Sequence, residues 1–267
     1  QEGNTSGIFQ FESQGMTNFM KELKPDCLED LIAGVSLYRP GPMDQIPRYI
    51  RGKQNPGHNE YTHPSLEPIL NVTYGCMVYQ EQVMQIVRDL AGYSLGRADL
   101  VRRAMGKKKL DVMAKEREIF INGQLDENGN IIVPGCVRNG IDAESANKIF
   151  DEMSEFAKYA FNKSHAACYA VVAYRTAYLK SYYPAEFMAS MLNSFLGNLD
   201  KVPEYIDECK RIGIKILKPD INSSSSKFTV EFDESQNKNN QIGQIRFGLG
   251  SIKNVGLQPI DNIIKDR

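Results

Sequence analysis

The sequence predicts a mainly α-helical protein with a small C-terminal α+β part. Through about residue 212, most segments place apolar side chains three and four positions apart, which is the period of an amphipathic helix. Beyond residue 213, short alternating runs and polar turns replace that period, as expected for strands. We therefore expect a helical domain over residues 1–198 and a C-terminal part over residues 199–267.

The helical period appears in several segments along the chain. Residues 26–37 form the first predicted helix, which the run 38–42 ends because proline cannot continue a helix. Residues 43–73 are rich in Pro, Gly, Asn and His and predict an irregular loop with short turns. The further predicted helices span 79–91, Ser94 (as N-cap) to Met105, 110–120, 142–157, 164–182, 185–196 and 200–212.

Short β-like runs occur in two places. A polar turn at 126–130 directly precedes the run 131–133 and predicts a small hairpin. Near the C-terminal end, apolar residues alternate with lysines and two strands flank a polar turn. These segments are 214–217, the strands 228–232 and 245–247, and the turn 233–241, followed by a glycine-rich turn at 248–256 and a last helix.

Composition excludes several classes of protein. The 267 residues are 42% hydrophobic and 24% charged with a net charge of −1, which rules out a disordered chain. The longest nearly apolar run, 166–174, is about half of the roughly 20 residues that a membrane-spanning helix needs. The five cysteines never form a Cys-x-x-Cys pair, so we expect buried thiols in a reducing cytoplasm rather than zinc ligands or disulfides.

Charge is strongly segregated, although the net value is small. Residues 97–109 sum to +5 and residues 158–180 to +4, whereas residues 142–155 sum to −4. The first basic cluster surrounds Gly106, where a helix end lets adjacent cations converge on one anion. Its candidate phosphate ligands are Arg102, Arg103, Lys107 and Lys108. A solvated helix face is the alternative interpretation of this cluster.

The second basic cluster is richer in chemistry. Residues 159–165 combine two aromatic rings, an amide, a cation, a hydroxyl and an imidazole, a mixture that suits a nucleotide. Tyr159 and Lys163 are four residues apart and are expected on one helix face. The candidate ligands of sugar, base and phosphates are Tyr159, Phe161, Asn162, Lys163 and His165. Core packing of the rings is the alternative.

Motifs for other chemistries are missing from the sequence. It has no Gly-x-x-x-x-Gly-Lys-Ser/Thr phosphate loop, no His-Glu-x-x-His and no Asp-x-Asp. No carboxylate pair stands out as a magnesium site, so we expect no metal ligands in this chain. The glycine-rich turn at 248–256 resembles half of a helix–hairpin–helix element, whose amides can point at a DNA phosphate. The residues assigned to DNA are Lys108, Gly248, Gly250, Lys253 and Gly256.

Several longer motifs occur together in one order. They are Gly7-Ile-Phe-Gln-Phe-Glu-Ser13, Tyr38-Arg-Pro-Gly-Pro42, Tyr74-Gly75 with Tyr79-Gln-Glu-Gln-Val-Met84, Ala91-Gly-Tyr-Ser-Leu-Gly96, Arg102-Arg-Ala-Met-Gly-Lys-Lys108, Phe161-Asn-Lys-Ser-His165, Tyr183-Pro-Ala-Glu-Phe187, Pro219-Asp-Ile-Asn222 and Ile245-Arg-Phe-Gly-Leu-Gly250. With these motifs the chain closely resembles the fingers region of the bacterial replicative C-family DNA polymerases, the DNA polymerase III alpha subunits, followed by the first half of their helix–hairpin–helix region.

The resemblance implies a fold and a function. Residues 1–198 would be the nucleotide-binding fingers domain of a cytoplasmic DNA-directed DNA polymerase, a nucleotidyltransferase of DNA replication. Its partners would be template-primer DNA, incoming dNTPs and the palm, with the sliding clamp and other replisome subunits bound outside this chain. The palm aspartates that hold Mg²⁺ would also lie elsewhere. Because the chain lacks a first methionine and both ends suggest a cut, we expect a piece excised from a longer protein. This piece would be inactive, because the catalytic aspartates would lie outside it.

Two other functions are left open by the residues. The chain would be a non-catalytic helix–hairpin–helix DNA-binding module if residues 248–256 were its functional part. It would be an interaction scaffold if it bound no ligand. Nucleotide binding would separate the polymerase interpretation from both, and salt-dependent duplex binding without nucleotide binding would favour the DNA-binding module.

Overall fold

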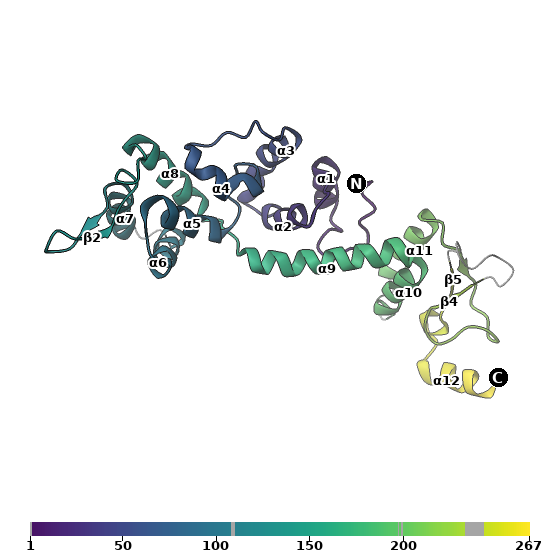
Figure 1. The fold of residues 1–267 in the computed structure, drawn as a ribbon. Helices are drawn as coiled ribbons and strands as arrows, with labels where there is room; N and C mark the ends of the chain where they lie inside the picture. Colours follow the sequence, from purple (N-terminus) through teal and green to yellow (C-terminus); the bar gives the residue numbers. More distant parts are fainter. Residues whose placement is uncertain (1, 108–109, 197, 199, 233–242) are drawn as a thin grey trace. The chain divides into compact units, whose positions relative to one another are not determined.

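A computed structural model describes residues 2–107, 110–196, 198, 200–232 and 243–267. By compactness, the chain divides into a first unit of residues 1–3 and 14–171 and a second unit of residues 4–13 and 172–267. The predicted mainly helical fold with small sheets is confirmed (Figure 1). The limit at residues 198 and 199 is a prediction about function and stays one.

The first unit is built from short helices. Its α-helices are α1 Gln14–Leu23, α2 Leu28–Leu37, α3 Ile46–Gln54, α4 Glu67–Leu70, α5 Gln80–Ala91, α6 Leu95–Gly106, α7 Leu110–Asn122 and α8 Ala143–Phe156, with 3₁₀ turns at Pro42–Gln45, Pro64–Leu66 and Asn71–Thr73. Strands β1 Gln124–Leu125 and β2 Ile131–Val133 pair antiparallel, which confirms the predicted hairpin. Helix α9, Lys163–Tyr182, begins in this unit and ends in the second.

Amphipathic patterning explains the best-predicted helices. In α5, Val83, Ile86, Val87 and Leu90 are each at most 2% exposed, and together they face a core shared with α6, α7 and α8. Their spacing puts all four on one side of the helix, so burying that side stabilises it by roughly 1.5–3 kcal/mol per side chain. Gly92 ends α5 in the left-handed conformation that only glycine adopts readily, with a φ of 76°.

Side-chain caps fix the starts of two neighbouring helices. Ser94 Oγ accepts a hydrogen bond from the Arg97 amide at 3.3 Å and begins α6, as the sequence predicts. The Asp142 carboxylate accepts one from the Ser145 amide at 2.8 Å and begins α8. Each cap satisfies an amide that lacks an intrahelical partner, which is worth about 1 kcal/mol.

The prediction of an irregular loop over residues 43–73 is wrong. Helix α3 lies within this segment and buries Tyr49 and Ile50. Its Pro47 stands in the first turn, where the missing amide hydrogen would have had no helical acceptor, so the proline does not oppose the helix. Helix α4 follows a 3₁₀ turn, and Pro68 likewise stands in its first turn.

The second unit combines helices with a three-stranded sheet. Its elements are the end of α9, α10 Pro184–Ser194, α11 Lys201–Arg211, β3 Ile216–Leu217, β4 Thr229–Glu231, β5 Gln244–Arg246, a 3₁₀ turn at Leu249–Ser251 and α12 Leu257–Asp266. The strand order is β3-β5-β4, with β5 antiparallel to β4 and parallel to β3. The predicted strands at 228–232 and 245–247 are confirmed, and the polar turn at 233–241 lies outside the described residues.

The expectation that the cysteines are buried thiols is corrected. Cys76, Cys136 and Cys209 are buried, but Cys27 and Cys168 are exposed, so the cysteines are not all buried thiols. Helix α9 has both buried and exposed residues. It packs alanines inward and exposes Tyr174, Tyr178 and Tyr182, whose neighbouring ring centroids lie 6.4 and 4.5 Å apart. Within the described ranges, no helix is long and apolar enough to span a membrane.

A buried ion pair anchors the N-terminal segment of the second unit. Lys180 Nζ lies 2.6 Å from Glu208 Oε1 and donates to the carbonyls of Ser6 at 2.7 Å and Asn4 at 3.2 Å. Arg211 forms two further hydrogen bonds of 2.7 Å with the same carboxylate. Burial alone would raise the pKa of Glu208, but the hydrogen bonds from Arg211 and Lys180 lower it.

We predict that Lys180→Met lowers the free energy of unfolding by about 3 kcal/mol, because it leaves a buried carboxylate short of a partner. Denaturation by urea measures this loss. Lys201→Met is the matched control, since Lys201 and Glu204 form an exposed pair of little value. Because the folded pKa of Glu208 is lowered, the stability from this cluster is present above about pH 4.3 and is lost as the pH falls through the folded pKa. Equal losses in both variants would contradict the prediction.

Candidate nucleotide site in the first unit

Two segments far apart in sequence meet where α5 begins. Tyr79 and Phe161 form an isolated parallel bridge, and the Gln80 amide donates to the Phe161 carbonyl at 2.9 Å. The Gln80 side chain donates to the Ala160 carbonyl at 3.1 Å. The run 159–165 is therefore held against the start of α5 by backbone and side-chain bonds together.

Gln80 also links this run to the first basic cluster. Arg102 Nη1 donates to Gln80 Oε1 at 3.1 Å, while Arg102 Nη2 donates to Asp99 at 2.7 Å. The two predicted basic clusters are thus brought together through one side chain. The hydrogen bond from Arg102 lowers the pKa of the Asp99 carboxyl, so this acid stays ionised.

The side chains of Arg102 and Arg103 differ in their exposure to solvent. Arg103 shares Asp99 at 2.7 Å, but 62% of its side chain is exposed, against 21% for Arg102. Adjacent helix positions point about 100° apart, so only one of the two can turn toward α5. Helix α6 ends at Gly106, as predicted, and Lys107 caps it from an exposed position. Lys108 lies outside the described residues.

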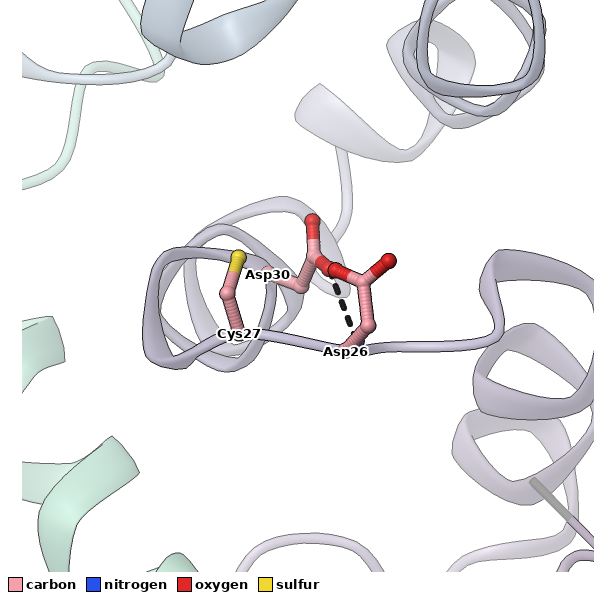
Figure 2. Close-up of side chains that lie close together, drawn as sticks. All are labelled: Asp26, Cys27 and Asp30. Atoms are coloured by element: carbon pink, nitrogen blue, oxygen red, sulfur yellow. Dashed lines mark hydrogen bonds between the residues drawn. The ribbon is translucent and has the colours of Figure 1, made fainter.

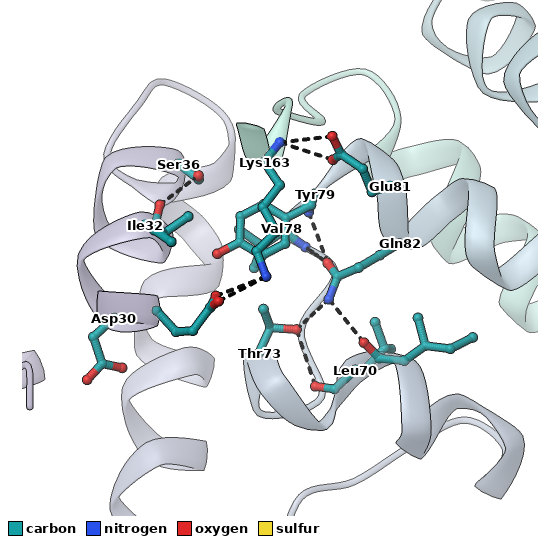
Figure 3. A network of polar contacts seen from close by, with 12 residues as sticks. Asp30, Ile32, Ser36, Leu70, Thr73, Val78, Tyr79, Glu81, Gln82 and Lys163 are labelled. Carbon is teal, nitrogen blue, oxygen red and sulfur yellow. Dashed lines mark hydrogen bonds and ion pairs between the residues drawn. The ribbon is translucent and has the colours of Figure 1, made fainter. Parts of the chain in front are cut away.

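Glu81 fixes the start of α9. Its carboxylate accepts from Asn162 Nδ2 at 2.8 Å. It also accepts from the Lys163 amide at 3.0 Å (Figure 3). Asn162 Oδ1 in turn accepts from the His165 amide at 2.9 Å, which makes Asn162 the cap of this helix. Because α9 starts at Lys163, Tyr159 precedes it, and the expected shared helix face of Tyr159 and Lys163 is wrong.

Lys163 is already paired in this structure. Its ammonium lies 3.0 Å from Glu29 and 5.1 Å from the centroid of the Tyr79 ring. Tyr79 is 1% exposed, and its burial, together with the charges of Glu29 and Glu81, raises the pKa of its hydroxyl. Lys163 therefore balances two nearby acids, and a phosphate would have to compete with Glu29 for its charge.

The rings of the run 159–165 are at least partly exposed to solvent. Phe161 and His165 meet edge to face with centroids 5.4 Å apart, and His165 lies 4.5 Å from Tyr169. His165 and Tyr159 are both exposed, Tyr159 at 48%. These exposed groups can meet a ligand without displacing a packed side chain.

Arg39 is a residue that sequence reasoning missed as part of this site. Its guanidinium carbon lies 4.0 Å from the centroid of the Phe161 ring, and its Nη2 donates to the Tyr159 carbonyl at 3.1 Å. Its Nε donates to the Ser36 carbonyl at 3.0 Å. Gly41 lies against the Tyr159 ring, where an added Cβ would stand 2.3 Å from Cδ1. Arg39 and Gly41 thus hold Tyr159 and Phe161 in place.

The missed partners are visible only as parts of motifs. Arg39 and Gly41 lie in the run 38–42, and Gln80 and Glu81 lie in the run 79–84. Both runs carry the family resemblance, but their partners are about 80 to 120 positions away. No local periodicity connects residues so far apart, so only an alignment of relatives would signal these pairs.

The DNA-binding prediction concerns the second unit. An added Cβ at Gly248 would lie 2.5 Å from the Lys227 backbone, and one at Gly250 would lie 2.7 Å from the Ser226 carbonyl oxygen. The amides of Leu249 and Gly250 donate to the carbonyls of residues 225 and 226, at 2.9 Å each. Both glycines therefore permit close backbone packing. Lys253 and Gly256 lie further along the turn in exposed positions.

One group of possible metal ligands occurs within the described part of the chain. Ligand atoms of Asp26, Cys27 and Asp30 lie within 4.8 Å of one another (Figure 2). However, Lys53 Nζ contacts Asp26 at 2.8 Å and Asp30 at 2.6 Å, and this hydrogen bond lowers the pKa of Asp26. An ammonium of the protein therefore already contacts both carboxylates and balances one of their two charges, and the cluster does not fit a catalytic magnesium ion.

Comparisons with known proteins match two separate parts of the chain. Residues 1–128 match the bacterial DNA polymerase III alpha subunit finger domain, and residues 213–267 match a helix-hairpin-helix motif. The chain is 47% identical over 272 residues to the DNA polymerase III subunit alpha of Pasteurella multocida, covering 98% of this chain. Identity is also 47% to the subunits of Pseudomonas aeruginosa and Escherichia coli, over 274 and 276 residues and the whole chain.

These similarities define a polymerase segment of the finger type. The chain spans only 22% of the length of these three relatives. It belongs, as a segment, to the family of bacterial DNA polymerase III alpha subunits, which confirms the resemblance carried by its motifs.

We predict that Gly41→Ala destabilises the protein by about 2 kcal/mol more than Gly57→Ala. Both glycines have a left-handed φ, 102° and 89°, but the added methyl meets the Tyr159 ring at position 41 and open space at position 57. The difference between the two unfolding free energies therefore isolates the contact with Tyr159. Amide hydrogen exchange should also accelerate over residues 159–165 in Gly41→Ala only, and unchanged exchange there would refute the role of Gly41.

Proposed function

We propose that the first unit holds the triphosphate of an incoming dNTP in a DNA-directed DNA polymerase. The observation that carries this proposal is the chain of hydrogen bonds from Arg102 through Gln80 to Ala160, which joins the two basic clusters. A triphosphate carries several negative charges within a few ångströms, so it needs cations from more than one element. The arrangement supplies them from α6 and from the start of α9.

Within this proposal the residues divide into two groups. Arg103, Lys107 and His165 are exposed and would contact the phosphates. Tyr159 would border the sugar or base, because its ring is half-exposed beside Phe161. The positioning residues are Arg102, Asn162 and Lys163, which are bonded to protein partners.

This arrangement would accelerate the reaction by electrostatics and positioning. In phosphoryl transfer, charge accumulates on the phosphate oxygens, and cations fixed beforehand stabilise that charge without reorganising. The Asp99 and Glu81 carboxylates hold the guanidinium and the helix start in place before the nucleotide arrives. Removing one such cation should cost roughly 10²–10³ in rate, by comparison with similar electrostatic contacts.

The proposal is tested by nucleotide binding. We predict that Arg103→Ala weakens dNTP binding to this chain by at least tenfold, because one charge-assisted contact is lost. Arg88→Ala is the matched control, since Arg88 is also exposed and paired with a neighbouring acid, Asp89. In the full-length polymerase the same variant should raise the KM for dNTP or lower kcat.

Unchanged binding and kinetics in Arg103→Ala would remove Arg103 from the site. Salt-dependent binding of duplex DNA without any nucleotide binding would instead favour a DNA-binding module. The helix-hairpin-helix match over residues 213–267 is the observation that favours this second function. We propose that Lys253 and the turn through Gly256 contribute DNA contacts in either case, with Lys108 assigned from the sequence.

We further propose that the isolated chain has no polymerase activity. The catalytic Mg²⁺ would be held by aspartates of the palm outside this chain, in the cytoplasm, where the clamp and other replisome subunits would also bind. Within the described residues, the one cluster of three possible metal ligands is Asp26, Cys27 and Asp30, and Lys53 contacts both of its carboxylates. We predict that primer extension with this chain yields no product while the full-length polymerase extends the same primer. Extension by the chain alone would refute the proposal.

A further inference from the structure

A basic hollow lies on α3, apart from the residues of the proposed nucleotide site. Its volume is about 600 Å³, and its lining includes Arg48, Arg51, Asn55, His58, Glu60 and Tyr74. Arg48 and Arg51 are three positions apart on α3, so they share one face of that helix. We call these six residues the basic hollow.

The walls of the basic hollow are set by close backbone packing. An added Cβ at Gly52 would lie 2.6 Å from Tyr74 Cβ and 2.7 Å from Asn59 Oδ1, so α3 packs closely against both residues at this glycine. The Tyr74 ring packs edge to face against the buried Tyr49 ring, with the two ring centroids 5.0 Å apart. Tyr74 and Gly75 both adopt left-handed φ values, so the chain turns sharply beside the basic hollow. The hollow is therefore shaped by fixed elements.

Its two guanidinium groups are not neutralised. Among the described residues, neither Arg48 nor Arg51 forms an ion pair, and Arg48 makes one long hydrogen bond of 3.4 Å to the Glu60 carbonyl. Their field reaches the interior: burial raises the pKa of the Cys76 thiol to about 11, while the charges of Arg48 and Arg51 act in the opposite direction. By contrast, Arg102, Arg103 and Lys163 all have carboxylate partners.

The hydrogen-bonding groups around the two cations suit phosphate oxygens. The guanidinium groups offer several donors each in a planar fork. The Asn55 side-chain amide donates to the Arg51 carbonyl at 2.9 Å and keeps its second N–H for a ligand, and the imidazole of His58 can add a further donor. Glu60 is the one acidic residue in the lining, and its negative charge opposes an anion bound nearby. The adjoining hollow of about 440 Å³ shares Asn59 but is lined by Glu67 and by no cation of the described chain.

Because the basic hollow is open to solvent, it suits a nucleic acid strand better than a small molecule. Arg48, Arg51, Asn55 and His58 are all exposed, so a ligand here stays largely in water. Small-molecule pockets usually bury most of their ligand, whereas a nucleic acid backbone is bound by cations along an open groove. The volume also exceeds what a single phosphate would fill.

We propose that the basic hollow binds backbone phosphates of a nucleic acid strand, at a place separate from the nucleotide site. Arg48 and Arg51 would each contact a phosphate, with Asn55 and His58 as additional donors. This inference does not depend on the proposed dNTP site, because no residue is shared between the two.

The test is the salt dependence of oligonucleotide binding to this chain, measured by fluorescence anisotropy with a labelled single strand. For Arg48→Gln/Arg51→Gln we expect roughly tenfold weaker binding at low salt. The slope of log K against log salt should fall in magnitude by about 1.5, since two phosphate contacts are lost. Lys115→Gln/Lys148→Gln removes the same charge from exposed positions of the first unit and should leave the slope nearly unchanged.

A second variant guards against misfolding. Glu60→Gln removes the opposing carboxylate and should tighten oligonucleotide binding severalfold, a gain that a damaged fold would not produce. A slope unchanged in the double arginine variant, equal losses in the lysine control, or no gain in Glu60→Gln would each overturn the proposal. Loss of binding to a free nucleoside triphosphate with unchanged oligonucleotide binding would also overturn it.

The failure of this inference and of the nucleotide site are distinguishable. Arg103→Ala should reduce dNTP binding while keeping the slope contributed by the basic hollow. Lys253→Ala, in the second unit, should lower the slope by about 0.7–0.9 independently, so its effect should add to that of the double arginine variant. An effect of Lys253→Ala that vanishes in the double variant background would show that both act at one site and would overturn the separate hollow.

Discussion

The buried carboxamide of Gln82 fixes where α5 begins, and the proposed nucleotide site depends on that position. Its Oε1 accepts from the amides of Val78 and Tyr79 at 2.8 and 2.9 Å, and its Nε2 donates to Thr73 Oγ1 at 2.8 Å (Figure 3). A buried amide left unpaired would cost about 1–3 kcal/mol, so alternative starts of the helix are disfavoured. Gln80 and Glu81, next to it, then meet the 160–163 run in one register.

That register explains why the cations near α5 are paired before any ligand binds. Asp99 holds Arg102, and Glu29 holds Lys163, so each positive side chain has a defined direction. The pairing lowers the affinity for an anion, because the ligand must compete with a carboxylate. It also removes the cost of ordering long side chains at the moment of binding. Arg103, which remains more exposed beside the same acid, combines an oriented helix with access to solvent.

Local patterns predicted the parts of this structure that local physics determines. The apolar spacing in α5, the Ser94 cap and the polar turn before β2 each act within a few residues, and each prediction is confirmed. Helix α3 was missed because its proline favours a helix start as well as a loop. The run 214–217 shows only a short alternation of apolar residues and lysines, because residues 216–217 become strand β3 only by pairing in parallel with β5. The chemistry of 159–165 was visible, but Glu81 and Arg39 come from distant segments.

The two groups of cations in the first unit differ in a way that net charge conceals. At Arg102 and Lys163, nearby acids cancel most of the long-range field, so discrimination there rests on short-range geometry. Arg48 and Arg51 have no ion-pair partner in the described chain, so their field extends outward until salt screens it, over about 10 Å at 0.1 M. Paired cations suit one ligand held in a single pose. Unpaired cations suit a polyanion that is attracted from a distance and held loosely, and a chain of net charge −1 can carry both.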